Sequence, residues 1–128
     1  MALDEINWEL DADRKSILFT ISTNPPMAFK LNGSQVDEML RNLGDLRALM
    51  TDQHSSRWPF GQTFEAVPHP AWSSEPEVQK GNSILHIRDP RYGWLHYVIP
   101  REHARQLGGI LSTQAEAPAS EPGPLQLN

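Results

Sequence analysis

Twice along this chain the apolar residues change from every second position to every third or fourth position, and this change limits the possible folds more than any other feature. In residues 16–31 apolar and polar side chains alternate, as in strands covered on one face, and Asn24-Pro25-Pro26 interrupts the alternation. From Ser34, a plausible N-cap, apolar residues recur at helical spacing to about Asp52. The pattern predicts a hairpin followed directly by an amphipathic helix.

The same order returns in the second half of the chain. The stretches 83–88 and 93–99 alternate like strands on either side of the segment 89–92, in which Asp89 and Pro90 favour a turn. Gly93 can take the positive φ needed to leave that turn. After Pro100, which a helix tolerates in its first turn, apolar residues follow at helical spacing to about residue 112.

The two halves align without a gap at an offset of 68 residues. Either an internal duplication or the common geometry of hairpin and helix explains this match. We expect an α+β fold in which two strand–strand–helix units, residues 16–52 and 82–112, form one antiparallel sheet backed by two helices. Eight pairs of positions should then be buried: Ile17 and Leu85, Phe19 and Ile87, Met27 and Leu95, Phe29 and Tyr97, Leu31 and Ile99, Val36 and Ala104, Met39 and Leu107, Leu43 and Leu111.

These units and the long loop 53–81 between them make up a single domain, residues 1–112. Ile6–Leu10 is a candidate edge strand and Thr63–Val67 is a candidate strand within the loop. The tail, residues 113–128, has several prolines and few apolar residues, and we expect it to be disordered.

Composition excludes several classes of protein. The 128 residues include no Cys, which rules out disulfides, cysteine nucleophiles and thiolate metal sites. No apolar run is long enough to span a membrane, and the acidic start does not resemble a signal peptide. We therefore expect a soluble bacterial protein of the cytoplasm. The net charge of −5 disfavours general adhesion to nucleic acid or anionic lipid.

One face of the second hairpin is unusual. If the hairpin closes symmetrically around Arg91, His86 lies opposite His96 and Arg88 opposite Trp94. Two histidines on neighbouring strands can chelate a metal ion or exchange a proton, but a metal site needs at least one more ligand, and we expect no Asp or Glu beside the pair. His54, His69 and His103 are not selected by any spacing. A partner-facing surface explains the pair better than a metal site does, and we assign neither a metal nor a cofactor.

Charge is distributed unevenly. Residues 80–106 contain five basic and two acidic residues, a net charge of +3, whereas residues 1–79 contain six basic and twelve acidic residues. The basic segment would suit an acidic protein surface or single-stranded nucleic acid stacked on Tyr92 and Trp94, and nucleic acid is the weaker of these alternatives.

Aromatic residues gather in the long loop, where Trp58, Phe60 and Trp72 stand among prolines. Such a loop serves either as a preorganised recognition surface or as a lid whose rings close one end of the core.

No serine, phosphate-binding or carboxylate motif indicates catalysis. We expect a non-catalytic interaction module, homodimeric or part of a larger assembly, that uses the aromatic loop and the hairpin residues His86, Arg88, Arg91, Tyr92, Trp94 and His96. The alternative is a small metal- or ligand-binding enzyme that uses His86 and His96.

Overall fold

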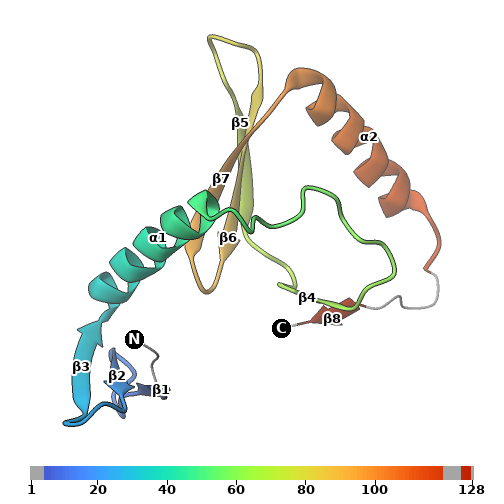
Figure 1. The fold of residues 1–128 in the computed structure, drawn as a ribbon. Coiled ribbons are helices and arrows are strands. Elements are labelled where there is room, and N and C mark those ends of the chain that lie inside the picture. The colour runs from blue at the N-terminus through green and yellow to red at the C-terminus, as the bar shows by residue number, and fades with distance from the viewer. Residues whose placement is uncertain (1–4, 120–124, 128) are drawn as a thin grey trace. The chain divides into compact units, whose positions relative to one another are not determined.

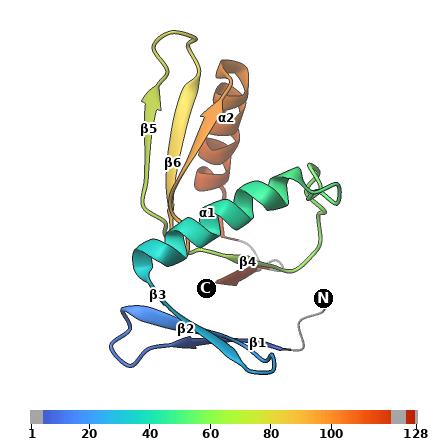
Figure 2. The same ribbon diagram turned by 60° about the vertical axis from the view of Figure 1, so that its left-hand side comes forward.

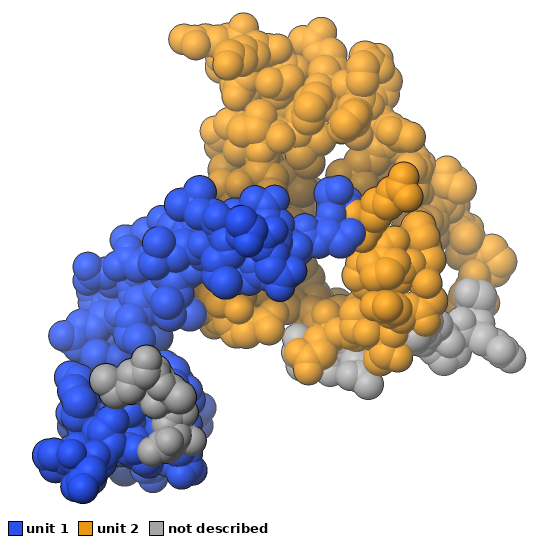
Figure 3. Space-filling model, viewed as in Figure 1, with its two compact units in different colours: residues 1–56 blue, residues 57–128 orange. Residues whose placement is uncertain are grey.

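The computed structural model describes residues 5–119 and 125–127 (Figure 1). The chain divides into two compact units, residues 1–56 and 57–128 (Figure 3). Each unit contains a three-stranded antiparallel sheet and one long helix. The α+β class is therefore confirmed, and the hairpins of the two units belong to separate sheets rather than to one.

The first unit is a meander of three strands that leads straight into a helix. Strands β1 (Ile6–Leu10), β2 (Ser16–Ile21) and β3 (Met27–Asn32) pair in the order β1-β2-β3. The predicted edge strand is thus present. Helix α1 (Gly33–Leu49) begins at the residue after β3 and points away from the sheet (Figure 1).

The second unit repeats this order of elements. Strands β5 (Trp72–Pro76), β6 (Ser83–Asp89) and β7 (Gly93–Ile99) pair in the order β5-β6-β7, with β6 in the centre (Figure 2), and helix α2 (Arg101–Glu116) follows. The long loop 53–81 also contains β4 (Phe64–Ala66), which lies within the predicted strand 63–67. Strand β4 pairs in parallel with β8 (Leu125–Leu127). Strand β5 was not predicted from the sequence.

The offset of 68 residues relates the two units closely. It maps the first residue of α1, Gly33, onto the first residue of α2, Arg101. The hairpins differ by two residues in register, because Phe19 pairs with Phe29 whereas the equivalent Ile87 pairs with Leu95. A shift of two residues leaves every side chain on its original face of the sheet. The common order of strands and helix suggests a duplication.

Helix α1 begins earlier than expected. Asn32 is its N-cap: the side-chain oxygen accepts a hydrogen bond from the Gln35 amide at 2.9 Å, and the Gln35 side chain accepts one from the Asn32 amide at 2.9 Å. This reciprocal pair is a capping box, which satisfies two backbone donors. The prediction of Ser34 as the cap was therefore wrong, because Asn32 and Gln35 have the required spacing.

Helix α2 continues to Glu116, beyond the predicted end near residue 112, and runs through Gly108 and Gly109 without a break. The segment predicted to be disordered, 113–128, thus includes the last turn of α2 and the strand β8. Residues 120–124 and 128 of that segment lie outside the described residues.

No side chain is buried in the parts of the chain for which burial is described, residues 5–119. The expected burial of the eight paired positions was wrong for the single chain: Phe29 is 42% and Tyr97 50% exposed. The physical reason is that neither helix lies along the sheet of its own unit. No loop separates β3 from α1, and only Pro100 separates β7 from α2, so each helix leaves its sheet without turning back.

Neither α1 nor α2, the helices of the described ranges, combines the length and apolarity that a membrane crossing requires.

Candidate functional site

The register of the second hairpin places the predicted histidines opposite one another. His86 in β6 pairs with His96 in β7, and Arg88 pairs with Trp94, as the symmetric turn predicted. The turn itself is stabilised by Asp89, whose carboxylate accepts a hydrogen bond from the Arg91 amide at 2.7 Å. That bond and the Arg91 side chain hold the pKa of the Asp89 carboxyl below its usual range.

Strand β5 adds a carboxylate to this face. Glu75 Oε2 lies 3.2 Å from His86 Nε2, and His86 Nδ1 lies 2.8 Å from His96 Nδ1. The three side chains therefore form one continuous chain of hydrogen bonds across the three strands. The expectation that no Asp or Glu stands beside the pair was wrong, because β5 brings Glu75 from the opposite edge of the sheet.

The hydrogen bonds decide which nitrogens carry protons when both rings are neutral. An ionised carboxylate can only accept, so His86 donates from Nε2 to Glu75 and presents a lone pair at Nδ1. His96 then donates from Nδ1 to His86 and keeps a lone pair at Nε2.

The other hairpin residues selected from the sequence lie around the turn. Arg88 ends the face beyond His86, directly across from Trp94, which is 47% exposed. Arg91 and Tyr92 belong to the turn, where the Arg91 guanidinium lies 5.3 Å from the centre of the Tyr92 ring. The hairpin thus presents one cation–π pair at its tip and the histidine pair near its middle.

The three aromatic residues selected in the long loop are not brought together. Trp58 packs edge-on against Phe64 of β4, with ring centres 5.1 Å apart, and Phe60 is 90% exposed. Trp72 opens β5 and pairs with Ile87, which places it on the sheet face opposite His86. Trp72 therefore extends the apolar face of the second sheet.

The first sheet carries an apolar face that sequence reasoning did not select as a site. Three rows of directly paired residues form it: Ile6, Ile21 and Met27, then Trp8, Phe19 and Phe29, then Leu10, Ile17 and Leu31. The central row is an aromatic stack, with ring centres 4.4 Å apart for Trp8 and Phe19 and 6.1 Å apart for Phe19 and Phe29. The opposite face is mostly polar, with rows Asn7, Thr20 and Ala28, and Glu9, Leu18 and Lys30.

This separation of faces is what a sheet covered on one side shows, yet the apolar face is open. Trp8 is 58% and Leu10 55% exposed. The signal was present in the alternation of residues 6–10, 17–21 and 27–31, but the pattern identifies a face without saying what covers it.

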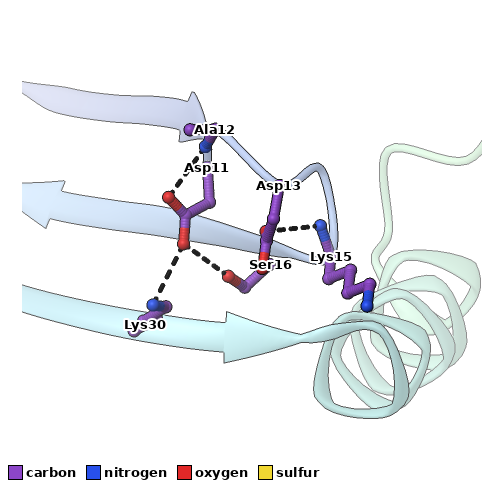
Figure 4. Close-up of polar contacts among 6 residues, drawn as sticks. All are labelled: Asp11, Ala12, Asp13, Lys15, Ser16 and Lys30. Atoms are coloured by element: carbon purple, nitrogen blue, oxygen red, sulfur yellow. Dashed lines mark hydrogen bonds and ion pairs between the residues drawn. The ribbon is translucent and has the colours of Figure 1, made fainter.

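A hollow of about 460 Å³ lies at one end of the first sheet, beside Asp11 and Lys30, and residues of both faces line it. Figure 4 shows the polar contacts of Asp11: its carboxylate accepts hydrogen bonds from the Ala12 amide at 2.8 Å and the Ser16 hydroxyl at 3.0 Å, and it pairs with Lys30 at 3.0 Å. The charges of Asp11 and Lys30 are therefore paired with each other, and these contacts stabilise the turn between β1 and β2.

Within residues 5–119 and 125–127, no three or more His, Asp or Glu side chains form a group that could hold a metal ion. The histidine pair therefore offers two protein ligands and one orienting carboxylate. A scan against protein-family models, a search of curated proteins and a search of solved structures find no match to this chain.

Proposed function

We propose that this protein is a non-catalytic interaction module that works as a homodimer, in which α1 of one copy covers the apolar face of β1-β2-β3 of the other. The observation that carries the proposal is that face: nine apolar side chains in three paired rows, open in the single chain.

The exposed area supports an interface of ordinary size. Five side chains of the face are roughly half exposed, which at about 200 Å² for each large side chain amounts to on the order of 500 Å². The apolar stripe of α1 is open as well, with Leu43 57%, Leu46 62% and Leu49 79% exposed. Together the two surfaces approach the roughly 800 Å² that each partner contributes to a stable complex.

A second copy of this chain is the occupant that the geometry favours. A twofold interface requires that one chain supply both complementary surfaces, and here each copy has an apolar sheet face and an apolar helix stripe. Because Asn32 is both the last residue of β3 and the N-cap of α1, no connecting residues allow α1 to fold back on its own sheet. The helix of a second copy does not have this restriction.

Neighbouring residues on β3 provide a matched test. Phe29 lies on the apolar face and Ala28 on the opposite face of the same strand. We expect wild-type protein to sediment as a dimer at micromolar concentration, Phe29→Glu to sediment as a folded monomer, and Ala28→Glu to remain dimeric. Circular dichroism verifies that both variants fold. A monomeric wild-type protein, or a dimer that Phe29→Glu leaves intact, would overturn the proposal.

A further inference from the structure

The Nδ1 atoms of His86 and His96 lie 2.8 Å apart, within hydrogen-bond distance, where β6 pairs with β7. From this juxtaposition we propose that the pair is a chelating site for a divalent transition metal of the copper(II) or nickel(II) class, with Glu75 as the residue that positions His86. The site lies within the second sheet and does not depend on the homodimer proposed above.

The spacing of the two nitrogens favours one class of metal. With metal–nitrogen bonds of about 2.0–2.1 Å, nitrogens 2.8 Å apart subtend roughly 86° at a shared ion. That angle suits two neighbouring positions of a square-planar or tetragonal centre, the geometry that copper(II) and nickel(II) prefer. A tetrahedral zinc ion would need the nitrogens to move apart to about 3.3 Å.

Glu75 prepares the first of the two ligands. Its carboxylate lies at His86 Nε2, on the far side of the ring from His96, so it directs the His86 proton to Nε2 and the Nδ1 lone pair toward the ion. An orienting carboxylate behind a ligating histidine is the usual outer partner in metal sites.

The second ligand becomes available without the release of a proton. His96 donates from Nδ1 in the metal-free pair, and moving that proton to its Nε2 leaves a neutral ring with the Nδ1 lone pair facing the ion. The site is accessible, because His96 is exposed and the side chain of His86 is 21% exposed. Water or a small chelating molecule would fill the remaining positions around the ion.

The paired strands hold the two ligands in place before the ion arrives. His86 and His96 are direct cross-strand partners in the longest ladder of the second unit, seven residue pairs from Ser83 and Ile99 to Asp89 and Gly93. A chelate fixed in this way loses less conformational freedom on binding than two independent side chains would.

The test is a titration of tag-free full-length protein with copper(II) alone, followed by electron paramagnetic resonance and visible absorption. We expect one ion per chain with nitrogen ligation. His86→Gln and His96→Gln should each lower the affinity at least tenfold, because one remaining imidazole cannot chelate, and the double variant should lower it at least as much. Glu75→Gln should lower the affinity roughly tenfold through lost orientation of His86.

Two control variants separate this site from adventitious binding. His103→Gln on α2 and His54→Gln in the long loop each remove an imidazole outside the pair, and we expect both to bind as the wild type does. A copper affinity that all four single histidine variants reduce equally, or that none reduces, would overturn the proposal.

A second measurement avoids the variants and any folding defect they cause. Nuclear magnetic resonance of the wild-type protein with about a tenth of an equivalent of copper(II) should broaden the imidazole signals of His86 and His96 before those of His54, His69 and His103. Simultaneous broadening of all five would contradict the site.

Discussion

The ammonium of Lys30 lies 3.0 Å from the carboxylate of Asp11, and this ion pair joins β3 to the turn between β1 and β2. The hydrogen bond from Lys30, followed by those from the Ala12 amide and the Ser16 hydroxyl, lowers the pKa of Asp11 below its ordinary value of 3.8. The same contact with Asp11 raises the pKa of Lys30 above 10.5. The two charges thus link all three strands of the first sheet.

The first prediction concerns stability in acid. A carboxyl whose pKa is lower in the folded state stabilises the fold above its unfolded pKa, and this contribution is lost as pH falls through the lowered folded value. Asp11→Asn should therefore lower the melting temperature modestly at pH 7 and flatten its further decline below about pH 4. Melting curves from pH 7 to pH 2 measure this, with Asp13→Asn as control, since Asp13 accepts the Lys15 amide and its own carboxylate forms no ion pair at contact distance with Lys30 among the described residues. Identical curves for wild type and Asp11→Asn would contradict it.

The second prediction concerns Gly81, which combines a positive φ with a close neighbour. Its φ is +72°, which a residue with a Cβ atom adopts only with strain, and the flexible guanidinium of Arg101 would have to move away from such an atom and give up the hydrogen bond from its Nε to the Gly81 carbonyl at 3.2 Å. Gly81→Ala should cost about 1–3 kcal/mol in the free energy of unfolding. Gly61→Ala is the control, because Gly61 has φ +88° but open space around it.

Denaturant titration should show the larger loss for Gly81→Ala, and Arg101→Ala in the same chain should recover part of it. Equal losses at the two glycines would mean that backbone strain alone is responsible and that the Arg101 contact contributes nothing.

The third prediction compares two candidate caps of α1. Asn32→Ala removes the side-chain oxygen that accepts the Gln35 amide, and should cost about 1 kcal/mol. Ser34→Ala should be nearly neutral, because Ser34 already lies inside the helix. Urea unfolding of the two variants decides the matter; a greater loss for Ser34→Ala would reverse the assignment.

The fourth prediction alters the connection between β3 and α1. Inserting a flexible Gly-Ser segment of about six residues after Asn32 should let α1 fold back on its own sheet, because the chain could then reverse direction. In the homodimer proposed above, this insertion should convert dimer to monomer. A matched insertion in the long loop, after Gln62, should leave the dimer intact.

Light scattering at several concentrations measures both insertion variants. The wild-type melting temperature should also rise with protein concentration, as expected for coupled folding and association, and that dependence should vanish for the insertion after Asn32. A concentration-independent wild type would contradict the prediction.

Much of the local structure was predictable because alternation and turn residues are short-range signals. The second hairpin has the predicted register, since Asp89 and Gly93 fix the turn and the register follows from it. The change from strand to helix spacing likewise located both helices, although the end predicted for α2, near residue 112, falls short of Glu116. The apolar spacing stops at Leu111, and the polar residues that continue the helix carry no such signal.

Long-range contacts were the part that the sequence did not reveal. Strand β5 alternates Trp72, Ser74 and Pro76 with two polar residues, a pattern that does not resemble a strand, so the approach of Glu75 to His86 was missed. The pairing of His86 with His96 was found because both residues belong to one hairpin, whereas Glu75 comes from a separate strand. The burial of the paired apolar positions was predicted wrongly for a similar reason. Alternation shows which side chains share a face of a sheet, but it does not show whether another element packs against that face.

The direct passage from β3 into α1 has a consequence for cells that contain two versions of this protein. In the proposed dimer the helix α1 of each copy covers the sheet of the other copy. A variant whose α1 is unchanged but whose sheet face is disrupted can therefore still bind an intact copy. Such a variant would act dominantly, and the number of working assemblies would fall faster than the supply of intact chains. A dominant effect of such a variant in cells that also make the intact protein would thus indicate that the two copies exchange helices.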